Sequence, residues 1–299
     1  MTTIAKPASL SQPTLHLQTQ RSLWGDAARR FFRNRLATFS LVIVLILIFM
    51  ALFANLLAPE GYDKQVYADA WQFPSQQHPL GTDPFGRDLL TRIIYGARIS
   101  LLVGFATNIA ALLIGLPIGA ISAWFGGVVD YIFMRIIDVV SAVPNLMLAI
   151  LIATVLGSGL SNVILIFTLT GWMGIARLVR GQLLSLREND YVLAARTIGV
   201  SDSRIIIRHL LPNALSPIIV SLTLGIPGAI LGEAGLSFLG VGVNAPLPSW
   251  GRMLNEYLKS VQSHWYLTFF PGLMIAITMY AFTMIGDGLQ DALDPTASK

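Results

Sequence analysis

The sequence contains no cysteine, only four lysines and few charged residues of either sign. Without cysteine, the chain has no disulfide, no cysteine nucleophile and no thiolate metal ligand. Charged residues make up 12% of the 299 residues, against about 25% in soluble proteins. Hydrophobic residues make up 54% and the mean hydropathy is +0.66. This composition indicates a membrane protein and argues against a nucleic-acid-binding protein, which would cluster its basic residues on a soluble face.

A phosphate-binding loop is also missing. Such a loop has the form GxxxxGK[ST], in which a lysine follows a glycine. None of the four lysines, Lys6, Lys64, Lys259 and Lys299, follows a glycine. The chain is therefore not itself an ATPase of this class.

Long apolar stretches dominate what is present. Six apolar stretches, of which the third holds Asp138 and the fifth Glu233, are long enough to cross a bilayer as helices, which takes about 20 residues. They are Leu36–Leu57, Ile99–Trp124, about Ile136–Leu156, about Leu160–Ala176, Ala214 to about Val241, and Leu267–Gly286. Pro144 and Pro227 predict bends in their spans, and the turn-forming Gly157-Ser158-Gly159 predicts a tight hairpin between the third and fourth spans.

We therefore expect an all-α membrane protein with six transmembrane helices in one domain. The expected parts are a cytoplasmic tail at 1–35, the helical domain at 36–286 with an outer loop at 58–98 and a cytoplasmic loop at 177–213, and a cytoplasmic tail at 287–299. The positive-inside rule supports a cytoplasmic N-terminus, because arginines gather before the first span: Arg21, Arg29, Arg30, Arg33 and Arg35. Leu23–Phe32 is predicted to form an amphipathic helix on the membrane surface.

The most informative segment is Tyr191–Pro212, a polar and arginine-bearing stretch between two apolar spans. Asn189 or Asp190 is expected to cap a first helix that ends at Ile198, with Gly199 in a left-handed turn. Ser201 or Asp202 is expected to cap a second helix that Pro212 helps to end. Ala194 and Ala195 are expected to present small side chains to a docking partner.

The outer segment His78–Asp88 begins with turn-forming residues. Asp83 followed by Pro84 predicts the start of a helix. The residues that follow place Leu89, Ile93 and Ala97 on one face, so we expect a separate helix at the outer membrane interface before the second span.

Catalytic alternatives fit the sequence poorly. An intramembrane aspartyl protease would pair Asp138 with Asp287. The residues that end at Asp287 lack the first glycine of the GxGD motif of such proteases, and Arg135 is expected to form an ion pair with Asp138. Ser237 lacks the glycine that follows a nucleophilic serine in GxSxG. No filter motif indicates an ion channel.

Two sets of motifs carry a resemblance. Ala194-Ala195, three residues, Gly199, nine residues and His209-Leu210-Leu211-Pro212 resemble the EAA signature of ABC importer permeases, with Leu193 in place of the family glutamate and His209 where isoleucine is common. HPLGTD…GRD…YGAR at residues 78–98, Gly232–Gly240 with Pro248-Ser249-Trp250-Gly251, and Gly286–Pro295 resemble the dipeptide, oligopeptide and nickel permeases. The resemblance covers roughly residues 25–295.

The resemblance implies the fold and partners of a type I ABC importer permease in a bacterial or archaeal inner membrane. The partners would be a second, different permease, two cytoplasmic ATPases that hold ATP and Mg²⁺, an extracytoplasmic binding protein and membrane lipid, with no nucleic acid. The chain itself would bind no cofactor and no metal, and His209 is interpreted as a capping or interface residue. Short peptides are the expected cargo, with nickel or glutathione as alternatives.

The residues that the resemblance and the spans assign fall into two groups. Those expected to couple to the ATPase are Leu193, Ala194, Ala195, Arg196, Gly199, Ser201, His209, Leu211 and Pro212. Those expected to line the translocation pathway, or else to hold helices together, are Ser141, Asn145, Ser221, Thr223 and Glu233.

Overall fold

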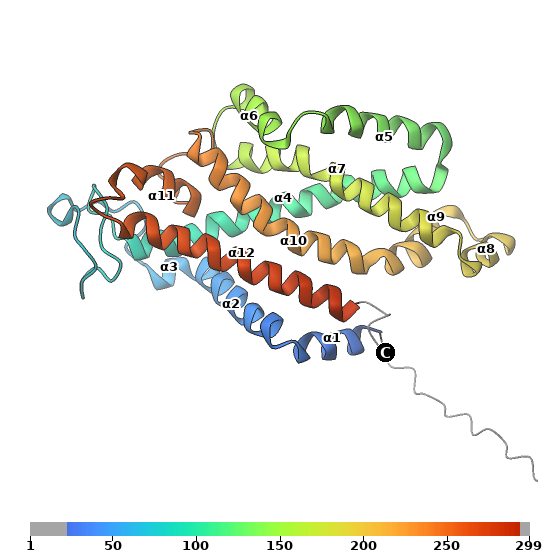
Figure 1. Cartoon of the computed structure of the whole chain (residues 1–299), viewed down its shortest axis with the longest axis horizontal. Helices are drawn as coiled ribbons and strands as arrows, with labels where there is room; N and C mark the ends of the chain where they lie inside the picture. The colour runs from blue at the N-terminus through green and yellow to red at the C-terminus, as the bar shows by residue number, and fades with distance from the viewer. Residues whose placement is uncertain (1–22, 294–299) are drawn as a thin grey trace, which may run out of the picture.

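The computed structural model describes residues 23–293 as an elongated helical bundle (Figure 1). Residues 1–22, with Arg21, and 294–299, which are parts of the expected tails at 1–35 and 287–299, lie outside the described residues. The α-helices are α1 (Leu23–Arg33), α2 (Arg35–Leu52), α3 (Ala54–Leu57), α4 (Leu89–Phe125), α5 (Gly127–Ser141), α6 (Asn145–Leu156), α7 (Leu160–Arg187), α8 (Asp190–Thr197), α9 (Asp202–Ile205), α10 (Leu211–Phe238), α11 (Trp250–Tyr257) and α12 (Tyr266–Leu293). Short 3-10 turns lie at Tyr67–Asp69 and Leu258–Ser260, and a π turn at Ile206–Leu210.

The described residues hold five helices long and apolar enough to span a membrane, or six when α5 and α6 count as one bent span. This agrees with the six expected spans. The loop before α4 and helix α11 lie at one end of the bundle, here called the α11 end, and α8 and α9 lie at the other, the α8 end (Figure 1). Helix α1 forms where the amphipathic pattern predicted it.

The prediction of a separate interfacial helix before the second span is wrong. Asp88, rather than Asp83, caps α4 by accepting a hydrogen bond from Thr91 N (2.8 Å), and the helix runs on for 37 residues. At 1.5 Å per residue it is about 55 Å long, well beyond the roughly 30 Å of hydrocarbon. The amphipathic turns are therefore the N-terminal part of the spanning helix itself.

The third span is broken. Helices α5 and α6 are bent by 85° at the residues between Ser141 and Asn145, where Pro144 precedes the first residue of α6. A proline lacks the N–H that would continue the helix. The bend predicted at Pro144 is thus present as a complete break.

The prediction that the second short helix ends at Pro212 is also wrong. Helix α9 passes through the π turn into α10, so residues Asp202–Phe238 form one continuous helical stretch. Pro212 lies in the first turn of α10. Proline has no N–H to donate, and the π turn at Ile206–Leu210 directly before α10 takes up the break in the regular α-helical hydrogen bonds.

Glycines allow α4 to lie directly against α7. A Cβ atom on Gly115 would come within 2.6 Å of Trp172 O, and one on Gly119 within 2.5 Å of Ala176 O. These distances are shorter than any ordinary contact, so only glycine allows this helix separation. Backbone-to-backbone approach through small residues is typical of membrane helix packing.

A buried ionic network holds the α11 end together. Arg87 and Arg92 donate to the two carboxylate oxygens of Glu256 (2.5 and 2.8 Å), and Arg87 also binds Asp83. Burial raises the pKa of the Tyr257 phenol well above its usual value of 10, so the phenol stays protonated and donates to Asp83 Oδ2 (2.8 Å). The network joins the loop before α4, α4 itself and α11.

We expect Gly119→Ala to lower the free energy of unfolding by about 1–3 kcal/mol, since the added methyl must push α4 and α7 apart. The measurement is the stability of the purified chain in detergent against increasing denaturant. Gly181→Ala is the matched control, because a Cβ at Gly181 on α7 meets nothing within 4 Å. Equal stability of the two variants would contradict the packing argument.

We expect Arg92→Met to lower the free energy of unfolding by about 3–5 kcal/mol, because the buried acidic groups lose a cationic partner. Arg92 is fully buried. In the control Lys64→Met, an exposed ion pair with Glu60 (3.0 Å) is removed, at an expected cost of about 1 kcal/mol or less. The same denaturant titration measures both, and a small effect of Arg92→Met would show that the network is not stabilising.

Candidate functional site

Residues 189–212, here called the coupling segment, form the α8 end of the bundle. Helix α8 ends at Thr197, and its cap residue Ile198 is followed by Gly199, whose φ is +78°. Gly199 N donates to Arg196 O (3.0 Å) and Val200 N to Ala195 O (3.1 Å), the paired bonds of a Schellman motif. This motif turns the chain from α8 into α9, as the sequence predicted for Gly199.

One face of the coupling segment is buried against the bundle. Val192, Ala195, Ile205 and Leu210 pack in a cluster with residues of α4, α7 and α10. Ala195, expected on the docking face, is therefore turned inward, whereas its neighbour Ala194 is exposed. Consecutive residues of a helix point about 100° apart, so adjacent alanines do not share a face.

The other face is exposed and partly apolar. Leu193 is 48% exposed, Ile198 80% and Ile207 65%. Of the other residues expected to couple, Arg196, Gly199, Ser201 and Pro212 are exposed, while His209 and Leu211 are half-buried. Exposed apolar side chains of this size gathered in one segment are typical of a protein interface.

Two arginines tie this end of the bundle to the C-terminal end of α4. The Arg196 guanidinium lies 4.2 Å from the centre of the Trp124 ring, a cation–π contact. Arg187 Nη1 donates to Ala123 O (2.7 Å). Movement of the coupling segment would therefore be transmitted to α4 as well as to α7.

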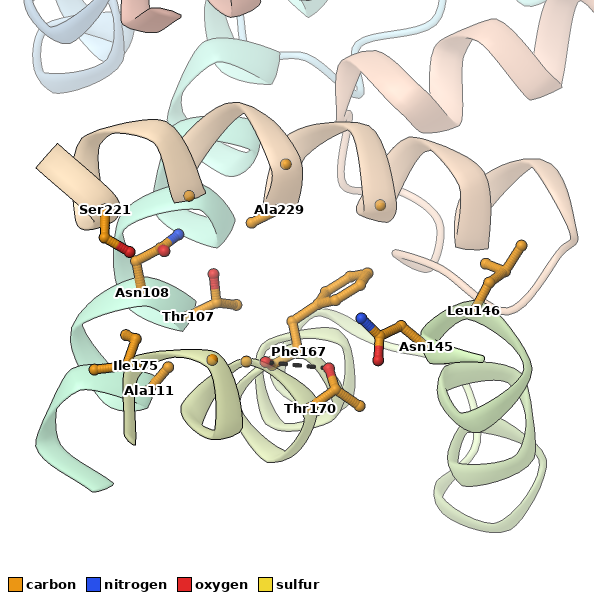
Figure 2. A pocket seen from close by; sticks show the side chains of 15 residues that line it. Thr107, Asn108, Ala111, Asn145, Leu146, Phe167, Thr170, Ile175, Ser221 and Ala229 are labelled. Atoms are coloured by element: carbon orange, nitrogen blue, oxygen red, sulfur yellow. Dashed lines mark hydrogen bonds between the residues drawn. The ribbon is translucent and has the colours of Figure 1, made fainter. Parts of the chain in front are cut away.

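A cavity of about 430 Å³ lies between α4, α6, α7 and α10 (Figure 2). This volume is within the range of about 300–1,000 Å³ usual for small-molecule sites. None of the described residues that line it is charged. Its polar side chains are Thr107, Asn108, Asn145, Thr170 and Ser221.

The structure brings together two of the five residues expected along the pathway. Asn145 projects from α6 toward Phe167, and Ser221 on α10 and Asn108 on α4 line the same cavity (Figure 2). Ser141 and Thr223 are not among the lining residues. Ser141 instead contacts Met173 Sδ (3.7 Å), and Thr223 donates to Ile219 O (2.9 Å).

Glu233 is placed outside this cavity as well. It is fully buried, and its Oε1 accepts hydrogen bonds from Ser237 Oγ and Ser249 Oγ, each at 2.7 Å. Ser249 is the N-cap residue of α11. Glu233 therefore joins α10 to α11 in this structure.

Thr107, Asn108 and Thr170 line the cavity but were not among the residues predicted along the pathway. Asn108 and Thr107 interrupt an otherwise apolar predicted span, which is a signal in itself. The glycines at 225, 228 and 232 recur on one face of α10 and also line the cavity. That periodicity could have indicated a bare helix surface opposite these polar groups.

No acidic pair of a protease forms among the described residues. Asp138 makes its ion pair with Arg177 (2.9 Å) rather than with Arg135, which donates to the Tyr131 hydroxyl (3.3 Å). Asp138 is on α5 and Asp287 on α12, and these helices lie on opposite sides of the bundle (Figure 1).

Comparisons with known proteins agree with this architecture. Residues 115–299 match the family described as binding-protein-dependent transport system inner membrane component, and residues 22–79 match the N-terminal TM domain of oligopeptide transport permease C. Among solved structures, a chain of the inward-facing MetNI methionine ABC transporter is similar, with a TM-score of 0.58 and 20% identity, over 69% of this chain and 98% of that chain. This likeness supports the expected fold class.

Relatives of known function are similar over nearly the whole chain. The chain is 46% identical over 278 residues to the oligopeptide transport system permease protein OppC of Bacillus subtilis, covering 93% of this chain and 91% of the relative. It is 47% identical over 271 residues to the dipeptide transport system permease protein DppC of the same organism, covering 90% and 85%. The glutathione transport system permease protein GsiD of Pectobacterium atrosepticum is 39% identical, covering 95% and 94%. The resemblance seen in the motifs is thus confirmed, and the chain belongs to the multi-pass inner-membrane components of binding-protein-dependent transport systems.

Proposed function

We propose that this chain is one of two permease subunits of an ATP-driven importer of short peptides. The observation that carries the proposal is the coupling segment, which has one face packed into the bundle and the other exposed and apolar. An exposed apolar face of this kind indicates a site that a partner protein covers. The relatives named for oligopeptide and dipeptide transport support peptide cargo.

The proposed orientation puts the N-terminus and the α8 end in the cytoplasm. Arginines of the described residues gather at this end, which suits the positive-inside rule: Arg29, Arg30, Arg33, Arg35, Arg177, Arg180, Arg187, Arg196, Arg204 and Arg208. The α11 end would then face the extracytoplasmic binding protein. Its loops are held by the buried network around Arg92, which suits a surface that must keep its shape on docking.

Two separate ATPases would dock on the coupling segments of this chain and its partner permease, and would hold ATP and Mg²⁺. The exposed Leu193 stands where the family signature has glutamate, so the contact would rest on apolar packing rather than an ion pair. Closure of the ATPases would move α8, and the Arg196–Trp124 contact and the buried cluster would pass that movement to α4 and α7. The spans would then alternate between inward and outward openings.

Nickel is a poor cargo for the observed cavity. Ni²⁺ is bound well by imidazole and by other nitrogen and oxygen ligands in a fixed geometry, whereas the described lining supplies only amides, hydroxyls and apolar groups. Glutathione remains the second candidate, because GsiD is 39% identical over 95% of this chain. The proposal favours peptides, whose named relatives reach 46% and 47% identity.

The proposal is tested by reconstituting the chain in lipid vesicles with its partner permease, ATPases and binding protein. We expect ATP-dependent uptake of a labelled di- or tripeptide, and little uptake of Ni²⁺ or glutathione. Vesicles without ATP are the control. Failure of any ATPase to copurify, or uptake of Ni²⁺ in preference to peptide, would contradict the proposal.

We expect Leu193→Asp to lower the amount of ATPase that copurifies by about tenfold or more, because burying an unpaired carboxylate easily exceeds the ~1.4 kcal/mol that corresponds to a factor of ten. The fold should survive, since Leu193 is 48% exposed. Leu258→Asp is the matched control, because Leu258 is similarly exposed (46%) but lies beside α11. Equal ATPase retention by both variants would remove Leu193 from the interface.

A further inference from the structure

Two cavities of the bundle meet at one point on α10. The cavity of about 430 Å³ shown in Figure 2 shares Ser221 and Gly225 with a second cavity of about 1,130 Å³, which reaches toward the α8 end. The second cavity is bordered by residues of α1, α7, α10 and α12. The two cavities therefore border the same turn of α10, at Ser221 and Gly225. We call Asn108, Ser221 and Gly225 the neck.

The neck holds hydrogen-bonding groups that the chain does not use. Asn108 Nδ2 donates to Gly104 O (2.8 Å). Because a carbonyl oxygen only accepts, this bond identifies the nitrogen of the amide and leaves Oδ1 directed toward Gly225. Within residues 23–293, neither Asn108 Oδ1 nor the Ser221 hydroxyl has a hydrogen-bond partner.

Gly225 makes room for the Asn108 amide. A Cβ atom on Gly225 would overlap Asn108 Oδ1 and lie 3.0 Å from Cγ. The bare backbone of α10 at this position therefore allows the amide to stay in the neck. Ser221 lies one helical turn before Gly225 on α10, and all three residues line the cavity of Figure 2, so the free acceptor and the free hydroxyl are presented to the same space.

We propose that the neck binds the main-chain amide groups of a peptide in transit, with Asn108 Oδ1 accepting an N–H and the Ser221 hydroxyl donating to a carbonyl. This inference rests on the proposed peptide cargo. Moving a peptide amide out of water without a new hydrogen-bond partner is unfavourable in free energy. A side-chain amide and a hydroxyl together supply an acceptor for its N–H and a donor for its carbonyl. None of the three neck residues is charged, and neither is the lining of the first cavity. The neck would therefore bind the main chain that all peptides share, whatever the charge of their side chains.

The experiment compares uptake of the tripeptide Ala-Ala-Ala with that of its depsipeptide, in which an ester oxygen replaces the central N–H. The complete complex in vesicles is used. The readout is the uptake rate of Ala-Ala-Ala divided by the uptake rate of the depsipeptide. We expect Asn108→Ala and Gly225→Ala each to lower this ratio about tenfold, the change that follows from losing one hydrogen bond. The ratio is insensitive to simple narrowing of the neck, and any preference of the binding protein is the same in every variant.

Gly235→Ala is the matched control on the same helix, because a Cβ there meets nothing within 4 Å and Gly235 lies outside both cavities. Its ratio should equal that of the unaltered complex. The double variant Asn108→Ala with Gly225→Ala should be no lower than Asn108→Ala alone, since both changes act through the same amide. Recovery of the partner subunits and basal ATP hydrolysis report correct assembly.

Unchanged ratios in Asn108→Ala and Gly225→Ala would overturn the proposed binding of peptide amides at the neck. They would not contradict the proposal that the complex imports peptides. If Asn108→Ala fails to assemble, the Gly225→Ala and Gly235→Ala pair decides between the two results. No uptake of any peptide by the assembled, unaltered complex would overturn the proposed function together with this inference.

Discussion

The close approach of α4 to its neighbours is the constraint on which the rest of the structure depends. Gly115 and Gly119 allow its backbone to meet that of α7, and Gly104 allows α10 to approach, since a Cβ there would lie 2.9 Å from Ile226. One helix thus sets the spacing of the others. Its two ends carry the remaining interactions, with Arg92 in the ionic network at one end and Trp124 beneath Arg196 at the other.

Charge is separated from the cavity for a physical reason. An ionised group inside the hydrocarbon is costly unless it is paired or faces water. Arg92 and Glu256 are paired at the α11 end, and Arg180 and Asp130 are paired between α7 and α5. The central cavity is left with amides and hydroxyls, which do not hold a passing solute as strongly as a charge would.

Several features were predicted correctly because they depend on local chemistry. The number of spans follows from the apolar runs, and the turn at Gly199 follows from the left-handed backbone that glycine adopts easily. The predictions failed where two local rules competed. Pro212 reads as a helix end, yet it lies in the first turn of α10, where the preceding π turn takes up the break that its missing N–H makes. The Asp83-Pro84 pair is typical of a helix start, yet the Asp83 carboxylate instead accepts hydrogen bonds from Arg87 and Tyr257.

The sequence by itself determined the class of the molecule: a helical membrane protein without a phosphate loop, with an arginine-bearing segment between two spans. Only the tertiary structure decided which polar residues meet. Asn108 and Gly225 are far apart in the chain and become neighbours only because α4 and α10 pack together, whereas Glu233, an equally conspicuous polar residue, is turned into the contact with α11. Hydrophobicity determines that a segment enters the membrane, but the direction a side chain faces depends on how the helices pack against each other.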